Sequence, residues 1–255
     1  MRLVIFTLNL LLLAPSGNSN QWINHGAYSL LNQISVVLFG FATIFLLVRM
    51  LPPSDVGVWV LFTSVGGILE TLRVGFIRIP FISLLVVSEE NERAKIIINS
   101  LLLHILLTFV VVSLLAICAG WLAKFWYADK LEQLFYVYSI NSFILIAFLH
   151  FEYFLQSALQ FKAIFIANFI RLFVFFAYIL GYFATGSSPA LLELAVVQLL
   201  ATGIASFFSY QLVKDEIPFF RRDLLDSKVL KKLFHLGKYT FGTNISAILI
   251  RNTDS

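Results

Sequence analysis

The sequence has few charged residues, and this shortage excludes most soluble proteins. Charged residues make up 13% of the 255 residues, whereas a soluble domain carries roughly a quarter. Hydrophobic residues make up 60% of the chain. The composition therefore predicts an integral membrane protein. The basic residues lie in short segments between apolar runs, so the formal charge of +4 indicates contact with a membrane surface rather than with nucleic acid.

Cysteine and the known catalytic motifs are also scarce or missing. Cys118 is the only cysteine, which excludes an internal disulfide, a Cys-x-x-Cys site and a zinc cluster of cysteines. The sequence contains no His-Glu-x-x-His, no Gly-x-Ser-x-Gly and no P-loop. None of its four histidines has a second ligand at helical spacing. We therefore expect no metal, no cofactor and no enzymatic activity.

Six stretches are long and apolar enough to cross a membrane. A helix needs about 20 mainly apolar residues to cross roughly 30 Å of hydrocarbon. Such stretches occur near residues 27–51, 56–78, 97–123, 134–158, 163–184 and 189–213. The connections between them are too short for a soluble domain, so we predict an all-α membrane protein with a six-span lobe over residues 22–213.

Basic residues are divided unequally between the two ends of these spans, and cytoplasmic connections retain Lys and Arg. If the second, fourth and sixth connections are cytoplasmic, the opposite side holds only Arg49, Lys124 and Lys130. The cytoplasmic side then holds twelve: Arg73, Arg78, Arg93, Lys95, Lys162, Lys214, Arg221, Arg222, Lys228, Lys231, Lys232 and Lys238. This bias predicts a cytoplasmic start to the first span and a basic cytoplasmic linker at 214–235.

The first connection reads RMLPPSDVG and has the features of a tight turn. Pro52 and Pro53 cannot continue the first helix. We expect Ser54 or Asp55 to cap the second helix by accepting hydrogen bonds from its free N–H groups. The segment is then an outer hairpin between two spans.

Both ends of the chain differ from this regular pattern. Residues 1–21 have a basic start, a short apolar run and a tail of small residues, which fits a signal peptide, a membrane-surface segment or a misassigned start codon. Residues 236–255 resemble the start of a seventh span that stops at Ser255. We expect the chain to be a fragment of a longer protein, and we predict that it is inactive alone.

Charged residues inside the spans are the best candidates for function, because an ion in hydrocarbon costs at least ~2.5 kcal/mol on insertion scales and tends to face a cavity or a partner. Glu70 and Arg73 lie three residues apart and can form an ion pair on one helix face. Arg171 lies nine residues after Lys162, or ~13 Å into the bilayer, which favours a cavity. The other candidates are Glu152, Glu193 and Arg251.

Two polar residues of the first span are further candidates. Asn32 and Ser35 lie three residues apart and therefore share a helix face. They fit a polar cavity wall and, equally, hydrogen bonds between helices.

Several segments together resemble a known transporter family. QWINHGAYSLLNQ, the hairpin LLVRMLPPSDVGVWVLF and GGILETLRVGFIRIPF follow one another as in the polysaccharide flippases of the multidrug/oligosaccharidyl-lipid/polysaccharide exporter superfamily. Arg73 stands where that family often has an acidic residue. The likeness continues in FLQSALQFKAIFIANFIR and in LKKLFHLGKYTFGTNISAILIRNTDS, so it covers about residues 22–255.

The resemblance implies a two-lobed, all-helical flippase, of which this chain supplies the first six-helix lobe and the start of the seventh helix. Its implied partners are the lipid bilayer and a polyprenyl-diphosphate-linked oligosaccharide, moved by alternating access across a bacterial or archaeal cytoplasmic membrane. Arg73, Arg171 and Arg251 are then cationic partners for the diphosphate. Glu70 and Asp254 are candidates for coupling to an ion or a proton.

Three alternatives stay open at this point. A drug or cation antiporter of the same superfamily favours acidic and aromatic cavity residues over arginines. A membrane enzyme such as a polysaccharide polymerase or an acyltransferase usually carries polar catalytic groups in a large outer loop, and the outer connections here are short. A non-catalytic subunit of a membrane complex has the same pattern of spans.

Overall fold

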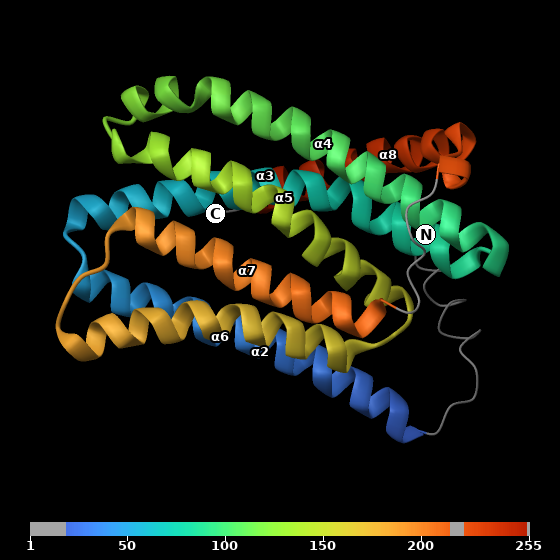
Figure 1. Cartoon of the computed structure of the whole chain (residues 1–255), viewed down its shortest axis with the longest axis horizontal. Helices are drawn as coiled ribbons and strands as arrows, with labels where there is room; N and C mark the ends of the chain where they lie inside the picture. The colour runs from blue at the N-terminus through green and yellow to red at the C-terminus, as the bar shows by residue number, and fades with distance from the viewer. Residues whose placement is uncertain (1–18, 215–221, 254–255) are drawn as a thin grey trace.

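The computed structural model describes residues 19–214 and 222–253, and all of its long elements are helices (Figure 1). Six of the helices are long and apolar enough to cross a membrane, which confirms the predicted all-α membrane architecture. A short 3-10 helix, η1, precedes the last long helix. The bounds are α2 Ser19–Met50, α3 Pro53–Val87, α4 Glu90–Phe125, α5 Lys130–Ser157, α6 Phe161–Thr185, α7 Leu191–Val213, η1 Arg222–Leu224 and α8 Ser227–Thr253.

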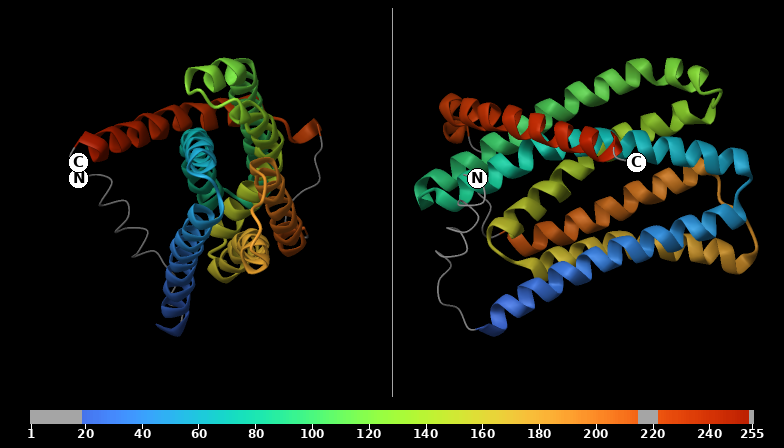
Figure 2. Two further views of the ribbon diagram at one scale, coloured as in Figure 1. Left: turned by 90° about the vertical axis from the view of Figure 1, so that its left-hand side faces the viewer. Right: turned by 180° about the vertical axis from the view of Figure 1, so that it is seen from behind.

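Helix α5 occupies the middle of the bundle and packs against α3, α4 and α7. Helix α2 packs along α6, and α8 packs along α3. In both views of Figure 2, α2 in blue and α8 in red lie apart from each other. The arrangement leaves much of the apolar surface of α2 exposed, as expected of a helix that faces lipid or the remainder of a larger protein.

Aromatic side chains hold α2 against α6. The Phe39 ring lies 5.4 Å from the ring of Phe169 and 5.3 Å from that of Phe176, both edge to face. Nearer the start of α2, the His25 ring meets Phe161 at 5.7 Å. Such pairs add about 0.5–1.5 kcal/mol each beyond the area that they bury, so these contacts tie the two helices along much of their length.

The first hairpin forms as predicted, but its capping differs. Pro52 occupies the N-cap of α3, and no side chain caps this helix. Asp55 instead accepts a hydrogen bond of 2.7 Å from Nζ of Lys130, at the start of α5. The carboxylate therefore links two helices at the expected outer face, because a lysine lies within its reach and offers a full charge.

Helix α3 continues to Val87, nine residues beyond the end expected at residue 78. Pro80 lies inside the helix, and a proline removes only the hydrogen bond to the carbonyl four residues earlier, here that of Phe76. Arg73 and Arg78 consequently lie within the span. They no longer count among the basic residues of the cytoplasmic connections. Ten basic residues against three remain, so the predicted orientation is unchanged.

Helix α8 uses this weakened part of α3 as a packing surface. A Cβ atom at Gly237 would lie 2.7 Å from the carbonyl oxygen of Phe76, so only glycine permits the approach. The Thr240 hydroxyl donates a hydrogen bond of 3.0 Å to the carbonyl of Gly75. Helix α8, which contains the start of the predicted seventh span, thus packs closely against the six-span lobe.

The start of α8 is fixed to α4 by a buried asparagine. Nδ2 of Asn99 donates to the Leu224 carbonyl at 2.9 Å, and Oδ1 accepts from the backbone N–H of Asp226 at 3.1 Å. Asp226 in turn caps α8 by accepting from the backbone N–H of Lys228. This cap starts the helix at Ser227, inside the segment 214–235 that was expected to be a linker.

Candidate functional site

One face of α5 presents three side chains that organise the polar centre of the lobe. Phe148, Glu152 and Gln156 follow one another at intervals of four residues and therefore lie on one stripe of the helix. The guanidinium carbon of Arg171, on α6, lies 4.6 Å from the centre of the Phe148 ring. Nε of Arg78, on α3, donates to Oε1 of Gln156 at 3.1 Å. Three helices thus place two guanidinium groups along one stripe.

Glu152 lies on the stripe between the residues that hold the two arginines. Its carboxylate is within electrostatic range of both Arg171 and Arg78, and Asn168 on α6 lies within its reach. The amide oxygen of Asn168 also accepts from Arg171 at 3.3 Å. We call these four residues, Arg78, Glu152, Asn168 and Arg171, the arginine site.

The arginine site is suited to binding an anion with several oxygens. Arg78 and Arg171 are both half-buried, so their charges are partly shielded from solvent and still within reach of a ligand. The guanidinium carbon of Arg171 lies over the Phe148 ring, and one of its NH2 groups donates to Asn168. Guanidinium edges match the oxygens of phosphate groups in a bidentate manner.

Arg73 has different contacts from the two arginines of this site. Its side chain is 2% exposed and donates to Thr108 on α4 at 3.2 Å and to Tyr138 on α5 at 3.4 Å. The phenol of Tyr138 donates in turn to the carbonyl of Gly66 at 2.9 Å. Arg73 therefore joins α3, α4 and α5 from within the packed bundle, whereas the sequence analysis expected it in a cavity.

The expected ion pair between Glu70 and Arg73 is not formed. Among the described residues, the ion pairs are Lys95 with Asp226 and Lys130 with Asp55. Glu70 is half-buried and lies within electrostatic range of Glu152. It therefore belongs to the surroundings of the arginine site, and its role in ion coupling stays a prediction.

The remaining predicted site residues are not joined to the arginine site. Asn32 and Ser35 are both half-buried on α2, and within the described part of the chain no hydrogen bond links them to Arg171. Arg251 falls on the last turn of α8, where side chains are not described, and Asp254 lies outside the described residues. Residues 1–18 lie outside them too.

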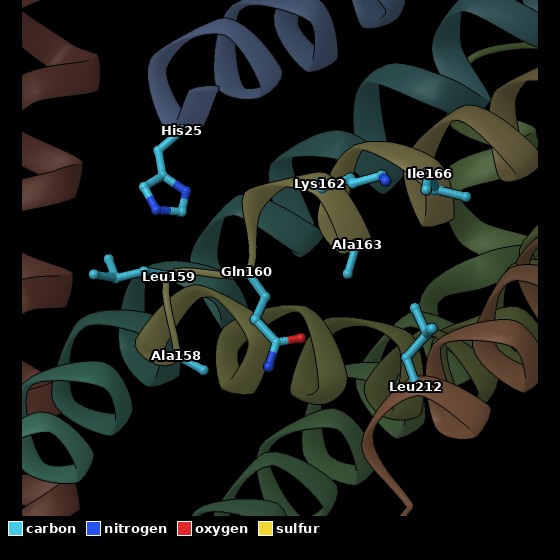
Figure 3. Close-up of a pocket in the computed structure, with 8 residues that line it drawn as sticks. All are labelled: His25, Ala158, Leu159, Gln160, Lys162, Ala163, Ile166 and Leu212. Atoms are coloured by element: carbon cyan, nitrogen blue, oxygen red, sulfur yellow. The ribbon is translucent and has the colours of Figure 1, made fainter. Parts of the chain in front are cut away.

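A pocket of about 600 Å³ lies at the end of the bundle where α5 turns into α6 (Figure 3). His25 of α2, Gln160 of the turn and Leu212 of α7 line it, and Lys162 contributes from the first turn of α6. Lys162 and Arg171 are nine residues apart, which at about 100° per residue places them on opposite sides of α6. The pocket is therefore separate from the arginine site.

Over the described ranges 19–214 and 222–253, no group of three or more His, Cys, Asp or Glu side chains is placed to hold a metal ion. The arginine site offers two guanidinium groups, a carboxylate and an amide, which act through charge and hydrogen bonding. Binding of an anion is what its residues can do.

Sequence reasoning found Arg171 and considered Glu152, but it missed Arg78, Asn168 and Gln156 as members of one group. The second span was expected to end near residue 78, which placed Arg78 in the following connection. The spacing of Phe148, Glu152 and Gln156 on α5 and of Asn168 and Arg171 on α6 was the available signal. This spacing becomes informative only when α5 and α6 are known to face each other.

The fold and this polar centre define a multi-pass membrane protein with the helical arrangement of a transporter lobe. The structure resembles a solved transporter described as an outward-facing conformation of a multidrug resistance MATE family transporter of the MOP superfamily. The TM-score is 0.69 at 17% sequence identity, over 89% of this chain and 52% of that one. The chain thus spans about half the length of that transporter, and the likeness shows the fold.

The family follows from the sequence itself. A family model described as "Polysaccharide biosynthesis protein" matches residues 46–255, and the chain belongs to this family. A comparison with curated proteins gives no match. The predicted membership of a polysaccharide-related family is thereby confirmed, and the likeness to the solved transporter confirms the predicted fold.

Proposed function

We propose that the complete protein moves a polyprenyl-diphosphate-linked oligosaccharide across the cytoplasmic membrane by alternating access, for the synthesis of a surface polysaccharide. The observation that carries this proposal is the pair of half-buried arginines, Arg78 and Arg171, within the membrane-spanning helices. Membership of a polysaccharide biosynthesis family supports a sugar-linked substrate. The diphosphate is the part of such a lipid that most needs cationic partners away from water.

The proposal assigns different surroundings to the parts of the substrate. The arginine site receives the diphosphate, since Arg171 on α6 and Arg78 on α3 supply two positive charges on helices that both contact α5. The polyprenyl chain stays among lipid and the apolar surfaces of the spans, and the sugar occupies the space between the two lobes of the complete protein. Arg251 and Asp254, near the end of the chain, remain proposed residues of the substrate-binding space between the two lobes.

A drug or cation antiporter is the second candidate, and two observations favour it. The solved structure that the chain resembles is described as a multidrug resistance transporter, and the acids Glu70 and Glu152 lie within electrostatic range of each other. An organic cation would need these acids and would be repelled by Arg78 and Arg171. Substrates of opposite charge thus make opposite demands on the same residues.

Complementation tests the proposal. The gene, read through to its own stop codon, is expressed in bacteria that lack a flippase for a lipid-linked oligosaccharide, beside Arg171→Ala and the control Lys238→Ala at an exposed position of α8. We expect surface polysaccharide to return with the wild type and the control and to be lost with Arg171→Ala at equal membrane levels. Failure of the wild type in several sugar backgrounds, together with resistance to cationic drugs, would favour the antiporter.

A further inference from the structure

The arginine site contains its own anion. Glu152 lies on the α5 stripe between Phe148, which contacts Arg171, and Gln156, which binds Arg78. Neither arginine forms an ion pair with Glu152 within 4.0 Å. Among the described residues, the ion pairs are Lys95 with Asp226 and Lys130 with Asp55. The carboxylate is therefore close enough to offset the positive charge and remains free of a direct contact that would lock the guanidinium groups.

Without a ligand, the four residues of the arginine site carry a net positive charge, and Glu70 is a further acid in their surroundings. Two guanidinium groups and one carboxylate leave one positive charge, whereas two guanidinium groups alone leave two. Positive charge without a partner is costly inside a bilayer. For net transport, a carrier that works by alternating access returns without its substrate, and in that form the unpaired positive charge of the empty site carries the cost.

We propose that Glu152 is the internal counter-anion of the site, which partly neutralises Arg78 and Arg171 when the site is empty and is displaced from them by the phosphate groups of the substrate. The inference rests on the proposed function, since it takes a lipid diphosphate as the ligand. Glu152 then opposes substrate binding and favours the return of the empty carrier. Removal of its charge has opposite effects on these two steps.

The other groups around Glu152 agree with this assignment. Asn168 accepts from Arg171 at 3.3 Å and lies within reach of the carboxylate. Glu70 is the second acid within electrostatic range of Glu152. A neutral substitute at position 152 keeps the shape of the side chain and removes only its competition.

Binding is measured first, on the purified product of the whole gene in detergent, with a farnesyl-diphosphate-linked N-acetylglucosamine as the probe. We expect Glu152→Gln to bind the probe roughly tenfold more tightly than the wild type, because one negative charge near the bound diphosphate is gone. Glu152→Asp retains the charge and should remain within about threefold of the wild type. Glu92→Gln, an exposed acid on α4, is the matched control with the same change of charge.

Transport by the product of the whole gene, read through to its stop codon, supplies the second measurement. In proteoliposomes, net movement of the probe requires the empty carrier to return, whereas exchange of labelled for unlabelled probe does not. We expect Glu152→Gln to lower net movement at least about fivefold while exchange stays within about twofold of the wild type, and Glu152→Asp to recover net movement. A residue needed only for folding would lower both activities together.

The outcomes separate the two proposals. No binding of the probe to the wild type, or equal binding to Arg171→Gln, overturns the diphosphate function and the role of Glu152 with it. Binding that needs Arg171 but is unchanged or weaker in Glu152→Gln overturns the counter-anion alone. Equal loss of exchange and of net movement in Glu152→Gln does the same.

Discussion

Two arginines inside the membrane, Arg73 and Arg171, have opposite surroundings although the sequence places both in apolar stretches. Arg73 is buried between α3, α4 and α5, and its partners Thr108 and Tyr138 are neutral. Arg171 is half-buried, rests on an aromatic ring and has an acid within electrostatic range. The comparison indicates that one arginine holds the helices together and that the other is available to a ligand.

The clearest test of this difference is Arg73→Ala, for which we expect the largest effect on stability. The substitution leaves a cavity and removes the charged donor from the hydroxyl groups of Thr108 and Tyr138. Loss of such contacts in a packed core costs about 3 kcal/mol. Denaturant titration in mixed micelles should show this loss, and Arg171→Ala in the same assay should lose less than about 1 kcal/mol. Equal losses would remove the distinction.

Binding should respond in the reverse order. We expect Arg171→Gln to weaken binding of the short-chain lipid diphosphate roughly 10- to 30-fold, because a charge-assisted contact to phosphate contributes about 1.5–2 kcal/mol. Titration of the purified protein with the probe gives the affinity. Lys162→Gln is the control, since this lysine lies on the same helix but on its opposite side. A similar loss in the control would indicate general attraction to positive charge.

A smaller effect separates the charge of Arg73 from the hydrogen-bond network that surrounds it. Tyr138→Phe removes the hydroxyl that accepts from Arg73 and donates to the Gly66 carbonyl while the ring stays in place. We expect a loss of about 1 kcal/mol in the free energy of unfolding and unchanged probe affinity. A fall in affinity would mean that the buried network influences the arginine site.

The sequence was sufficient for the number and order of the spans, because length and apolar composition determine which segments can cross a bilayer. It was insufficient for the direction of their side chains. A helix that is apolar on all sides has no polar face to indicate which side is buried. The spacing of Glu70 and Arg73 therefore permitted an ion pair, but the hydroxyls of Thr108 and Tyr138 on neighbouring helices bind the arginine instead.

The same limit explains why Arg78 was missed and why α3 matters for the site. A proline in a sequence usually marks the end of a helix, and Pro80 follows Arg78 by two residues. Inside the bundle α3 nevertheless continues, with Pro80 itself buried and Gly237 of α8 packed against Phe76. The Phe76 carbonyl, which Pro80 leaves without its helical hydrogen bond, therefore lies against α8 and two residues before Arg78. We expect a movement of α8 to reach α3 within one turn of this arginine, so that the packing of α8 influences the site.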